Sequence, residues 1–157
     1  RSRIARLLAI RELIEAVTVL VRLHMFQLPV HPSGAALRRL LNKAGSPDRL
    51  RDLVELRRAD IVATGRTCWQ STAIWQELKE RVEEILAAGA AFSLRDLAID
   101  GEDVMRLRGL GPGPEVGRIL AALLERVLED PALNERGKLE TLVHDLLDDS
   151  AKGESAP

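Results

Sequence analysis

Residues 93–128, SLRDLAIDGEDVMRLRGLGPGPEVGRILAALLERVL, predict a short helix, a Gly/Pro turn at 109–114 and a longer amphipathic helix. Pro114 suits the first position of the longer helix, because proline has a helical φ and lacks an N–H that would have no acceptor there. The next three N–H groups also lack intrahelical acceptors. Together with the positive end of the helix dipole they favour a bound anion. This stretch therefore predicts both a helical fold and an anion site.

Glycines and arginines surround this turn. A glycine has no Cβ, so a second backbone can come close to it, and arginine side chains bind phosphate oxygens. The residues predicted to bind phosphate are Arg106, Arg108, Gly111, Gly113, Val116, Gly117 and Arg118. The alternative is a tight interhelical turn without a ligand. Glu115 favours that alternative, because a carboxylate in the first turn already interacts with the dipole and repels phosphate.

The rest of the chain also has helical periodicity, and no run alternates apolar and polar residues as a strand does. Ser33 and Ser46 are predicted as N-caps, Pro47 as a first helical residue and Gly45 as a left-handed stop. Further caps are predicted at Ser93 with Asp96, at Asp100 with Asp103, and at Asn134. The other predicted helices are residues 3–25, 34–44, 47–64, 72–88 and 135–147. We predict an all-α bundle of about six to seven helices, divided into body and tail, without a sheet.

Small residues at 87–91 predict a boundary between two units. Residues 1–89 are predicted to form a helical body unit and residues 90–147 a helical tail unit. Residues 148–157 lack long apolar side chains, so we expect a mobile tail. Helical periodicity starts at once at Arg1, which is not Met, so we expect this chain to be a piece of a longer protein.

Composition excludes several classes of protein. The chain has 46% hydrophobic and 30% charged residues, which is typical of a globular protein. A net charge of −1 gives no global attraction to nucleic acid or membrane. Aromatic residues make up 3%, which argues against binding single strands on stacked rings. One cysteine, Cys68, and the lack of a signal peptide or spanning apolar run predict a cytoplasmic location without membrane contact.

Charge is distributed unevenly along the chain. Residues 37–66 contain eight basic and four acidic side chains, whereas residues 129–157 contain three basic and eight acidic side chains. The middle of the chain can therefore present a basic face to phosphates, with Arg57, Arg58 and Arg66 as further candidate contacts. The alternative is a solvated helix face whose charges pair along the helix.

The sequence contains no recognisable reactive site. It has no P-loop, no Gly-x-Ser-x-Gly and no His-Glu-x-x-His motif. His24 and His31 lack the spacing of a helical zinc pair, with no cysteine or carboxylate cluster nearby. Trp69 and Trp75 have the helical spacing expected of core residues rather than of stacking platforms. We therefore predict no catalytic residue and no metal ligand.

A set of motif positions follows the order Asp96-Leu97, Ile99, Gly101, Asp103, Gly113-Pro114, Val116-Gly117, Leu120 and Asn134-Glu135. In this order they resemble the C-terminal end of bacterial tRNA nucleotidyltransferases (CCA-adding enzymes) and their poly(A) polymerase relatives. Residues 53–66 resemble the helix that precedes these motifs, and residues 20–25 resemble the segment that follows an HD-type region. The metal-binding His–Asp pair of the HD-type region is absent, so metal binding is not carried over.

The resemblance implies a non-catalytic region that grips the acceptor–TψC arm of tRNA and delivers its 3′ end to a separate N-terminal head. We therefore expect tRNA and this head as partners. Mg²⁺ and CTP or ATP are expected only in the head. Such a region must accept every tRNA, so it should recognise backbone and shape, through helix N-termini and arginines. The turn residues are the expected RNA contacts, with Arg57, Arg58 and Arg66 as additional ones. Whether the longer protein adds CCA, CC, A or poly(A) stays open.

Two other classes of function remain open at this point. Residues 107–120, LRGLGPGPEVGRIL, resemble a helix-hairpin-helix DNA-binding module, which would bind duplex DNA without preferring tRNA. A structural or oligomerisation domain would instead leave a large exposed apolar patch and would dimerise without regard to RNA.

Overall fold

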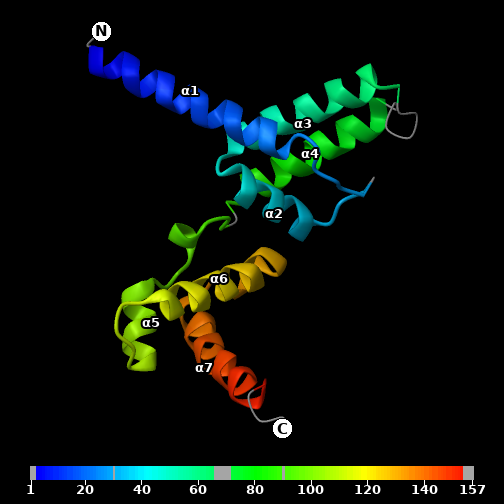
Figure 1. Ribbon diagram of the computed structural model, residues 1–157. Helices are drawn as coiled ribbons and strands as arrows, with labels where there is room; N and C mark the ends of the chain where they lie inside the picture. Colours follow the sequence, from blue (N-terminus) through cyan, green and yellow to red (C-terminus); the bar gives the residue numbers. More distant parts are fainter. Residues whose placement is uncertain (1–2, 30, 66–71, 90, 154–157) are drawn as a thin grey trace. The chain divides into compact units, whose positions relative to one another are not determined.

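The computed structural model describes residues 3–29, 31–65, 72–89 and 91–153 (Figure 1). In these ranges the chain forms seven α-helices and short 3₁₀ turns, without a strand. The predicted all-α class is therefore confirmed. The chain divides into two compact units, Arg1–Gly89 and Ala90–Pro157. No helix in the described ranges is long and apolar enough to cross a membrane.

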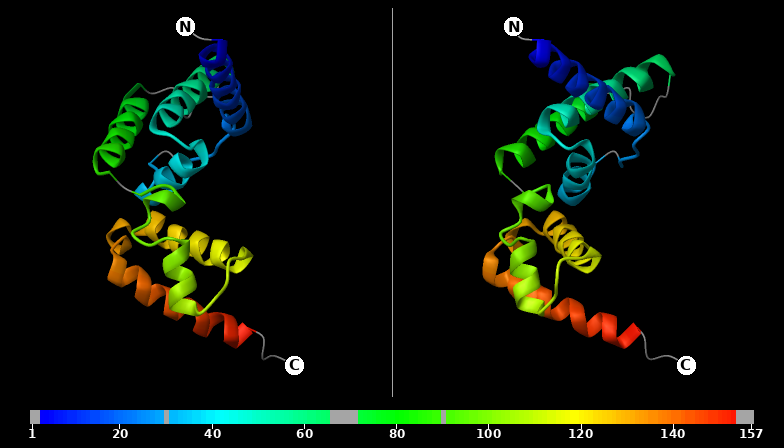
Figure 2. Two further views of the ribbon diagram at one scale, coloured as in Figure 1. Left: turned by 90° about the vertical axis from the view of Figure 1, so that its left-hand side faces the viewer. Right: turned by 60° about the vertical axis from the view of Figure 1, so that its left-hand side comes forward.

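The first unit contains α1 (Arg3–Leu23), α2 (Gly34–Ala44), α3 (Pro47–Ala63) and α4 (Thr72–Ala87). Two serine caps begin α2 and α3: Ser33 Oγ accepts from the N–H of Ala36, and Ser46 Oγ accepts from the N–H of Arg49. Gly45 ends α2 with a φ of 81°, in the left-handed region that suits glycine. Both predicted starts are confirmed, and α3 and α4 lie side by side (Figures 1 and 2).

The core of this unit lies between α2, α3 and α4. Its buried apolar side chains are Ala35, Leu37, Leu40, Leu41, Ala44, Leu50, Leu53, Val54, Ile61, Trp75, Leu78 and Val82. Trp75 is buried, so its predicted place in the core is confirmed, whereas Trp69 lies outside the described residues. Val62 is exposed, because neighbouring Ile61 occupies the inward position of that turn.

Helix α1 is apolar on two opposite sides. Ala16, Val19, Leu20 and Leu23 are half-buried on the side toward α2 and α3. The outer side carries Leu7, Ile10, Ile14, Val17 and Val21, which are 49–61% exposed. The prediction of a helix over this segment is confirmed, but most of the apolar residues on which that prediction is based lie outside the core. Periodicity shows that a helix has an apolar face and does not show what covers that face.

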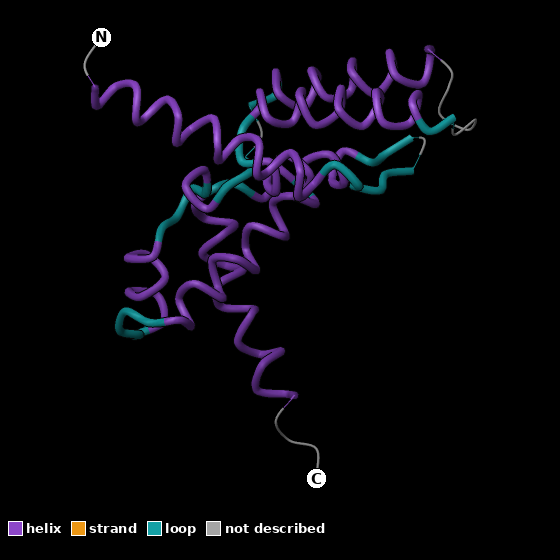
Figure 3. Tube along the Cα trace, turned by 45° about the horizontal axis from the view of Figure 1, so that its top comes forward, coloured by secondary structure: helices purple, strands orange, loops and turns teal. Residues whose placement is uncertain are grey.

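The second unit contains η2 (Leu94–Asp96), α5 (Gly101–Arg108), α6 (Pro114–Glu129), η3 (Pro131–Leu133) and α7 (Arg136–Gly153). Its helices pack around a separate apolar core, and α6 contributes the largest number of buried residues to it. Figure 3 draws the helices of the chain in purple and the loops that join them in teal. The most deeply buried side chains of this core are Ile99, Val104, Leu123, Val127, Leu128, Leu139 and Val143.

The capping box before α5 is confirmed. Asp100 Oδ1 accepts from the N–H groups of Glu102 and Asp103, and Asp103 Oδ2 accepts from the N–H of Asp100. These reciprocal bonds satisfy N–H groups at the helix start that have no intrahelical acceptor.

Asn134 does not cap the last helix as predicted. Its Oδ1 accepts from the N–H of Ala98 at 2.9 Å, and its Nδ2 donates to the carbonyl of Asp96 at 2.8 Å. The side chain therefore ties the chain before α7 to the loop before α5. A nearby helix start and a distant loop both offer partners to an asparagine, and only the packing decides between them.

Helix α7 continues six residues beyond its predicted end at Leu147. Residues 148–152 contain no glycine or proline, and the next helix breaker is Gly153. The helix thus includes residues 148–153 of the segment predicted to be a mobile tail, and the mobility of that segment stays a prediction. Residues 154–157 lie outside the described residues.

Candidate nucleic-acid interface

The turn between α5 and α6 is open around its glycines. Gly109 ends α5 with a φ of 63°, and its N–H donates to the carbonyl of Met105. A Cβ added at Gly111, Gly113 or Gly117 would meet no described atom within 4 Å beyond its chain neighbours. Gly113 has extended backbone that any residue can adopt, so its glycine is not required by its φ. These positions leave room for another molecule, as predicted.

The start of α6 has no side-chain cap among the described residues, since its N-cap is Gly113 and Pro114 follows. Glu115 and Gly117 are exposed, whereas the side chain of Val116 is buried in the core. Val116 therefore offers a ligand only its backbone. The helix dipole attracts an anion to this point, and the carboxylate of Glu115 opposes it.

The structure separates the three predicted arginines at this turn. Arg106 donates from Nη2 to Asp103 Oδ1 at 2.5 Å. Arg108 donates from Nη1 to the carbonyl of Val143 in α7 at 3.1 Å. Arg118 is exposed and has no ion-pair partner among the described residues. Two of the three guanidinium groups are thus held by contacts within the unit, and Arg118 is the one left available to a ligand.

Asp103 is the carboxylate that binds the arginines near the start of α5. Its carboxylate is buried and accepts from the N–H of Asp100 and from the guanidinium groups of Arg106 and Arg136. Burial acts to raise the pKa of Asp103, but these hydrogen bonds stabilise the charged form and hold the pKa below its ordinary value. The Asp103 carboxylate, which accepts the hydrogen bond from Arg106, therefore stays ionised.

The arginines predicted in the middle of the chain are ion-paired where they are described. Arg57 donates from Nη1 to Asp60 Oδ2, and Arg58 donates from Nε to Glu55 Oε2, both at 3.0 Å. The side chain of Arg57 is only 12% exposed. These pairs fit the alternative of a solvated, charge-paired helix face. Arg66 lies outside the described residues, as does Cys68.

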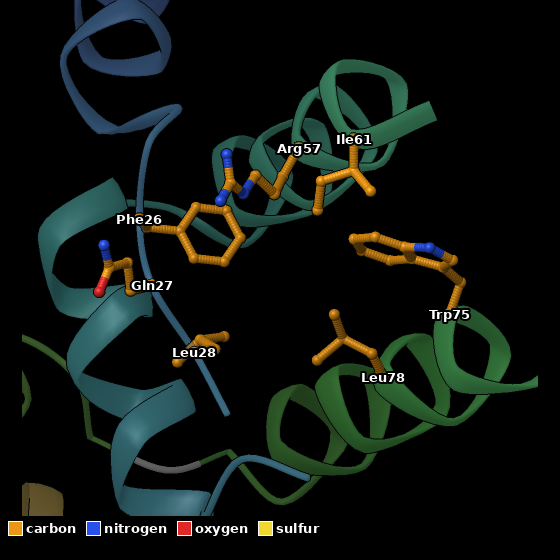
Figure 4. A pocket seen from close by; sticks show the side chains of 7 residues that line it. All are labelled: Phe26, Gln27, Leu28, Arg57, Ile61, Trp75 and Leu78. Atoms are coloured by element: carbon orange, nitrogen blue, oxygen red, sulfur yellow. The ribbon is translucent and has the colours of Figure 1, made fainter. Parts of the chain in front are cut away.

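A hollow of about 280 Å³ lies in the first unit between the α1–α2 connection, α3 and α4. Figure 4 shows Phe26, Leu28, Trp75 and Leu78 facing it, with the guanidinium of Arg57 beside the ring of Phe26. Ile61 and Gln27 complete its lining. Its lining thus combines five apolar side chains with the polar side chains of Gln27 and Arg57.

The two histidines near the end of α1 have separate partners. His24 Nδ1 lies 2.6 Å from the carbonyl of Val21, and His31 Nδ1 lies 2.9 Å from Glu77 Oε1. In the described ranges no group of three or more His, Cys, Asp or Glu side chains is placed to hold a metal ion.

One hollow of the first unit has basic side chains in its lining and was not predicted from the sequence. Arg22, Arg39 and Lys43 line a single hollow formed by the end of α1, the chain after it, and α2. The signal was present in the sequence: residues 16–47 contain four basic and no acidic residues. The excess of basic residues over positions 37–66 does not include Arg22, and that range contains the acidic residues of α3.

A family model described as tRNA nucleotidyltransferase domain 2 (putative) matches residues 52–143, which include the whole α5–α6 turn. This chain belongs to the tRNA nucleotidyltransferase family. The resemblance noted in the sequence is therefore confirmed. A relative of this tRNA nucleotidyltransferase chain is the CC-adding tRNA nucleotidyltransferase of Thermus thermophilus, 43% identical over 122 residues. The match covers 76% of this chain and 25% of the relative, so the chain spans about a quarter of that enzyme's length. No solved structure matches the chain.

Proposed function

We propose that this chain is the non-catalytic tRNA-binding region of a tRNA nucleotidyltransferase and acts in the cytoplasm. It holds the acceptor–TψC arm by its backbone phosphates, so that the 3′ end reaches a catalytic head elsewhere in the longer protein. The family match over residues 52–143 carries the proposal, because it includes the turn whose geometry suits a phosphate. Mg²⁺ and the CTP or ATP substrate belong to the head in this proposal.

The start of α6 supports this role by its chemistry. Its exposed residues offer backbone N–H groups, the positive end of a 16-residue helix, and Arg118 one turn further on. These groups bind phosphate without reading bases, as a protein that accepts every tRNA requires. One exposed anion at a helix start contributes about 0.3–1 kcal/mol. Several such contacts are therefore needed, and most of the affinity should depend on salt.

A binding assay with two nucleic acids tests this proposal against the DNA-binding alternative. We expect the chain to retard an unmodified tRNA transcript in a gel and to release it as salt rises. A duplex DNA of equal phosphate number should compete poorly. Equal competition by the duplex would favour the helix-hairpin-helix alternative, and no retardation of either would contradict both.

A second assay tests the proposed division between binding and catalysis. The sequence contains no Gly-rich strand-turn or Asp-x-Asp pair that matches the catalytic head implied by the resemblance. The chain alone should therefore add no radiolabelled CMP or AMP to a tRNA lacking its CCA end. Incorporation above a buffer control would contradict the proposal.

The outer side of α1 favours a second candidate, an oligomerisation function. Leu7, Ile10, Ile14, Val17 and Val21 are spaced by three, four, three and four residues and are all exposed. This is the spacing of a coiled-coil seam, which a second copy of the chain can cover. Sedimentation should then show a dimer that Ile14→Glu dissociates without changing tRNA affinity. A monomer at every concentration would exclude this candidate.

A further inference from the structure

Helix α1 carries most of the exposed apolar surface of the described chain. Seven of the eleven exposed large apolar side chains belong to it, and every residue from Ala5 to Glu15 is exposed. Figure 1 shows this first half of α1 extending beyond the other helices of the first unit. An isolated helix of this length is only marginally stable in water, so this half of α1 needs a surface to pack against.

A second apolar feature lies at the other end of α1. A hollow of about 450 Å³ lies between the end of α1 and the second half of α3, and we call it the α1–α3 hollow. Its lining residues are Val21, His24, Leu56, Ala59, Asp60 and Ala63. Val21 is also the last residue of the outer apolar stripe of α1, which we call the outer seam. The outer seam is Leu7, Ile10, Ile14, Val17 and Val21. The seam and the hollow are therefore continuous.

We propose that α1 pairs in antiparallel orientation with α1 of a second copy of this chain, and that the first half of each α1 fills the α1–α3 hollow of the other copy. This inference rests on the oligomerisation candidate above and gives it an orientation and a second contact. A two-fold axis near Ile14, in the middle of the helix, makes the two contacts identical, so the assembly closes as a dimer.

The charges beside the outer seam favour the antiparallel orientation. With the seam at the a and d positions of a heptad repeat and Leu7 at a, Arg6 is at g and Arg11 is at e. In a parallel pair a g position faces the e position of the next heptad, so Arg6 would repel Arg11 of the second copy. In an antiparallel pair g faces g and e faces e. This brings Arg6 toward Leu20, and Arg11 toward Thr18, of the second copy.

The α1–α3 hollow also contains a charge of the opposite sign to these arginines. An antiparallel pair lays Arg3 and Arg6 of one copy along the last turns of α1 in the other, where the helix dipole is negative. The carboxylate of Asp60 lies in the hollow, and its Oδ2 accepts from Arg57 Nη1. Arg22, the basic side chain of that last turn, lines the other hollow, toward α2. An arginine that enters the α1–α3 hollow therefore meets a carboxylate.

Two variants of the full chain, both on α3, test the hollow. Leu56→Gln changes a side chain that is 39% exposed and lines the hollow, whereas Val62→Gln changes one that is 59% exposed and is not among its described lining residues. Sedimentation over a series of concentrations measures the Kd of the dimer, and circular dichroism measures folding. We expect Leu56→Gln to raise this Kd about tenfold or more, because each dimer contains two hollows. Val62→Gln should change it by less than about threefold.

A third variant covers the case in which Leu56→Gln does not fold. Ala59 is exposed and lines the same hollow, so Ala59→Gln should also weaken the dimer. A Kd unchanged by Ala59→Gln in a folded chain would reject the hollow as a contact.

The distance between two spin labels tests the orientation. Cys68→Ser removes the native thiol, and Arg3→Cys then carries a nitroxide label at the start of α1. At a rise of about 1.5 Å per residue, an antiparallel pair centred near Ile14 separates the two labelled positions by about 30 Å. A parallel pair places them about 10 Å apart, at the distance between packed helices. Double electron–electron resonance measures this distance on the dimer.

The results that contradict the proposal differ from one another. A dimer whose labelled positions lie about 10 Å apart would reject the antiparallel orientation and keep the oligomerisation candidate. Equal effects of Leu56→Gln and Val62→Gln would reject the hollow as a contact. A chain that stays monomeric at every concentration would overturn the whole proposal and leave the outer seam to a different partner. None of these results bears on the tRNA-binding function, which is measured separately.

Discussion

Asp103, in the first turn of α5, accepts a hydrogen bond from the guanidinium of Arg136, the first residue of α7 and 33 positions further along the chain. The same Oδ1 atom accepts from Arg106, and Oδ2 accepts from the N–H of Asp100. One buried carboxylate thus joins the starts of two helices. The ionised state of Asp103 therefore contributes to the arrangement of the second unit.

Asp103→Asn should lower the Tm by several degrees at neutral pH, because the amide has no charge to offer the two arginines. The folded state lowers the pKa of this carboxyl below its ordinary 3.8, so its stabilising contribution is fully present above that value. The contribution is lost as the pH falls from there through the lower folded-state pKa. Thermal unfolding of wild type and variant from pH 7 to pH 3 should therefore show the gap in Tm closing with acid.

The control for this variant is Asp52→Asn, which changes an exposed carboxylate on α3. It should leave the Tm unchanged at neutral pH. A constant gap between Asp103→Asn and wild type across the whole pH range would show that the charge of Asp103 does not matter.

Leu139→Ala tests the core of the second unit. Leu139 is fully buried in α7, and truncating such a leucine costs about 2–5 kcal/mol of unfolding free energy. Leu94→Ala, at a leucine that is 45% exposed, should cost about 0.5 kcal/mol or less. Urea denaturation followed by circular dichroism measures both. Equal costs would contradict the division of these leucines into core and surface.

Gly117→Asp should weaken tRNA binding by about two- to fivefold, which corresponds to the 0.3–1 kcal/mol of a charge at a helix start. The site has space for the side chain, so the helix should remain folded. Glu115→Gln should strengthen binding by a similar factor, because it removes a repelling carboxylate. Fluorescence anisotropy with a tRNA transcript measures both changes.

Gly137→Asp is the matched control, since Gly137 is also open and exposed but belongs to the first turn of α7. It should leave the affinity nearly unchanged. If Gly117→Asp and Gly137→Asp weaken binding equally, the start of α6 is not a specific phosphate contact.

Arg118→Glu and Arg106→Glu should behave differently. Arg118 is exposed and has no described ion-pair partner, so its reversal should weaken tRNA binding at an unchanged Tm. Arg106 pairs with Asp103, so a glutamate there would place a second carboxylate beside the first and lower the Tm by several degrees. Affinity and Tm measured on the same preparations separate the two roles. An unchanged Tm for Arg106→Glu would show that the Arg106–Asp103 pair does not stabilise the fold.

The chain's helices and their ends followed from local chemistry. Ser33, Ser46 and Asp100 cap helices as predicted, and Gly45 and Gly109 stop them in the left-handed conformation. Each of these caps and stops forms between residues that are at most four or five positions apart, so the local sequence is enough to predict it. The open Gly/Pro turn was predictable for the same reason.

The candidate site was only partly predictable. The sequence predicted a phosphate contact for both Arg106 and Arg118. Only the fold shows that Arg106 pairs with Asp103, whereas Arg118 is exposed and has no described ion-pair partner. Asn134 looked like a local cap and instead bonds to a loop 36 positions earlier. The hollow lined by Arg22, Arg39 and Lys43 forms only where the end of α1 meets α2, which the number of charges along the chain does not show.

The sequence by itself determined the all-helical class, the caps, the turn before α6 and the family to which the chain belongs. The tertiary structure decided which apolar faces are covered and which arginines keep a free surface. The physical reason is distance along the chain: bonds such as Arg108 to the Val143 carbonyl join positions 35 apart. Such partners come together only when the core closes, because packing against the whole surface sets them and local propensity does not.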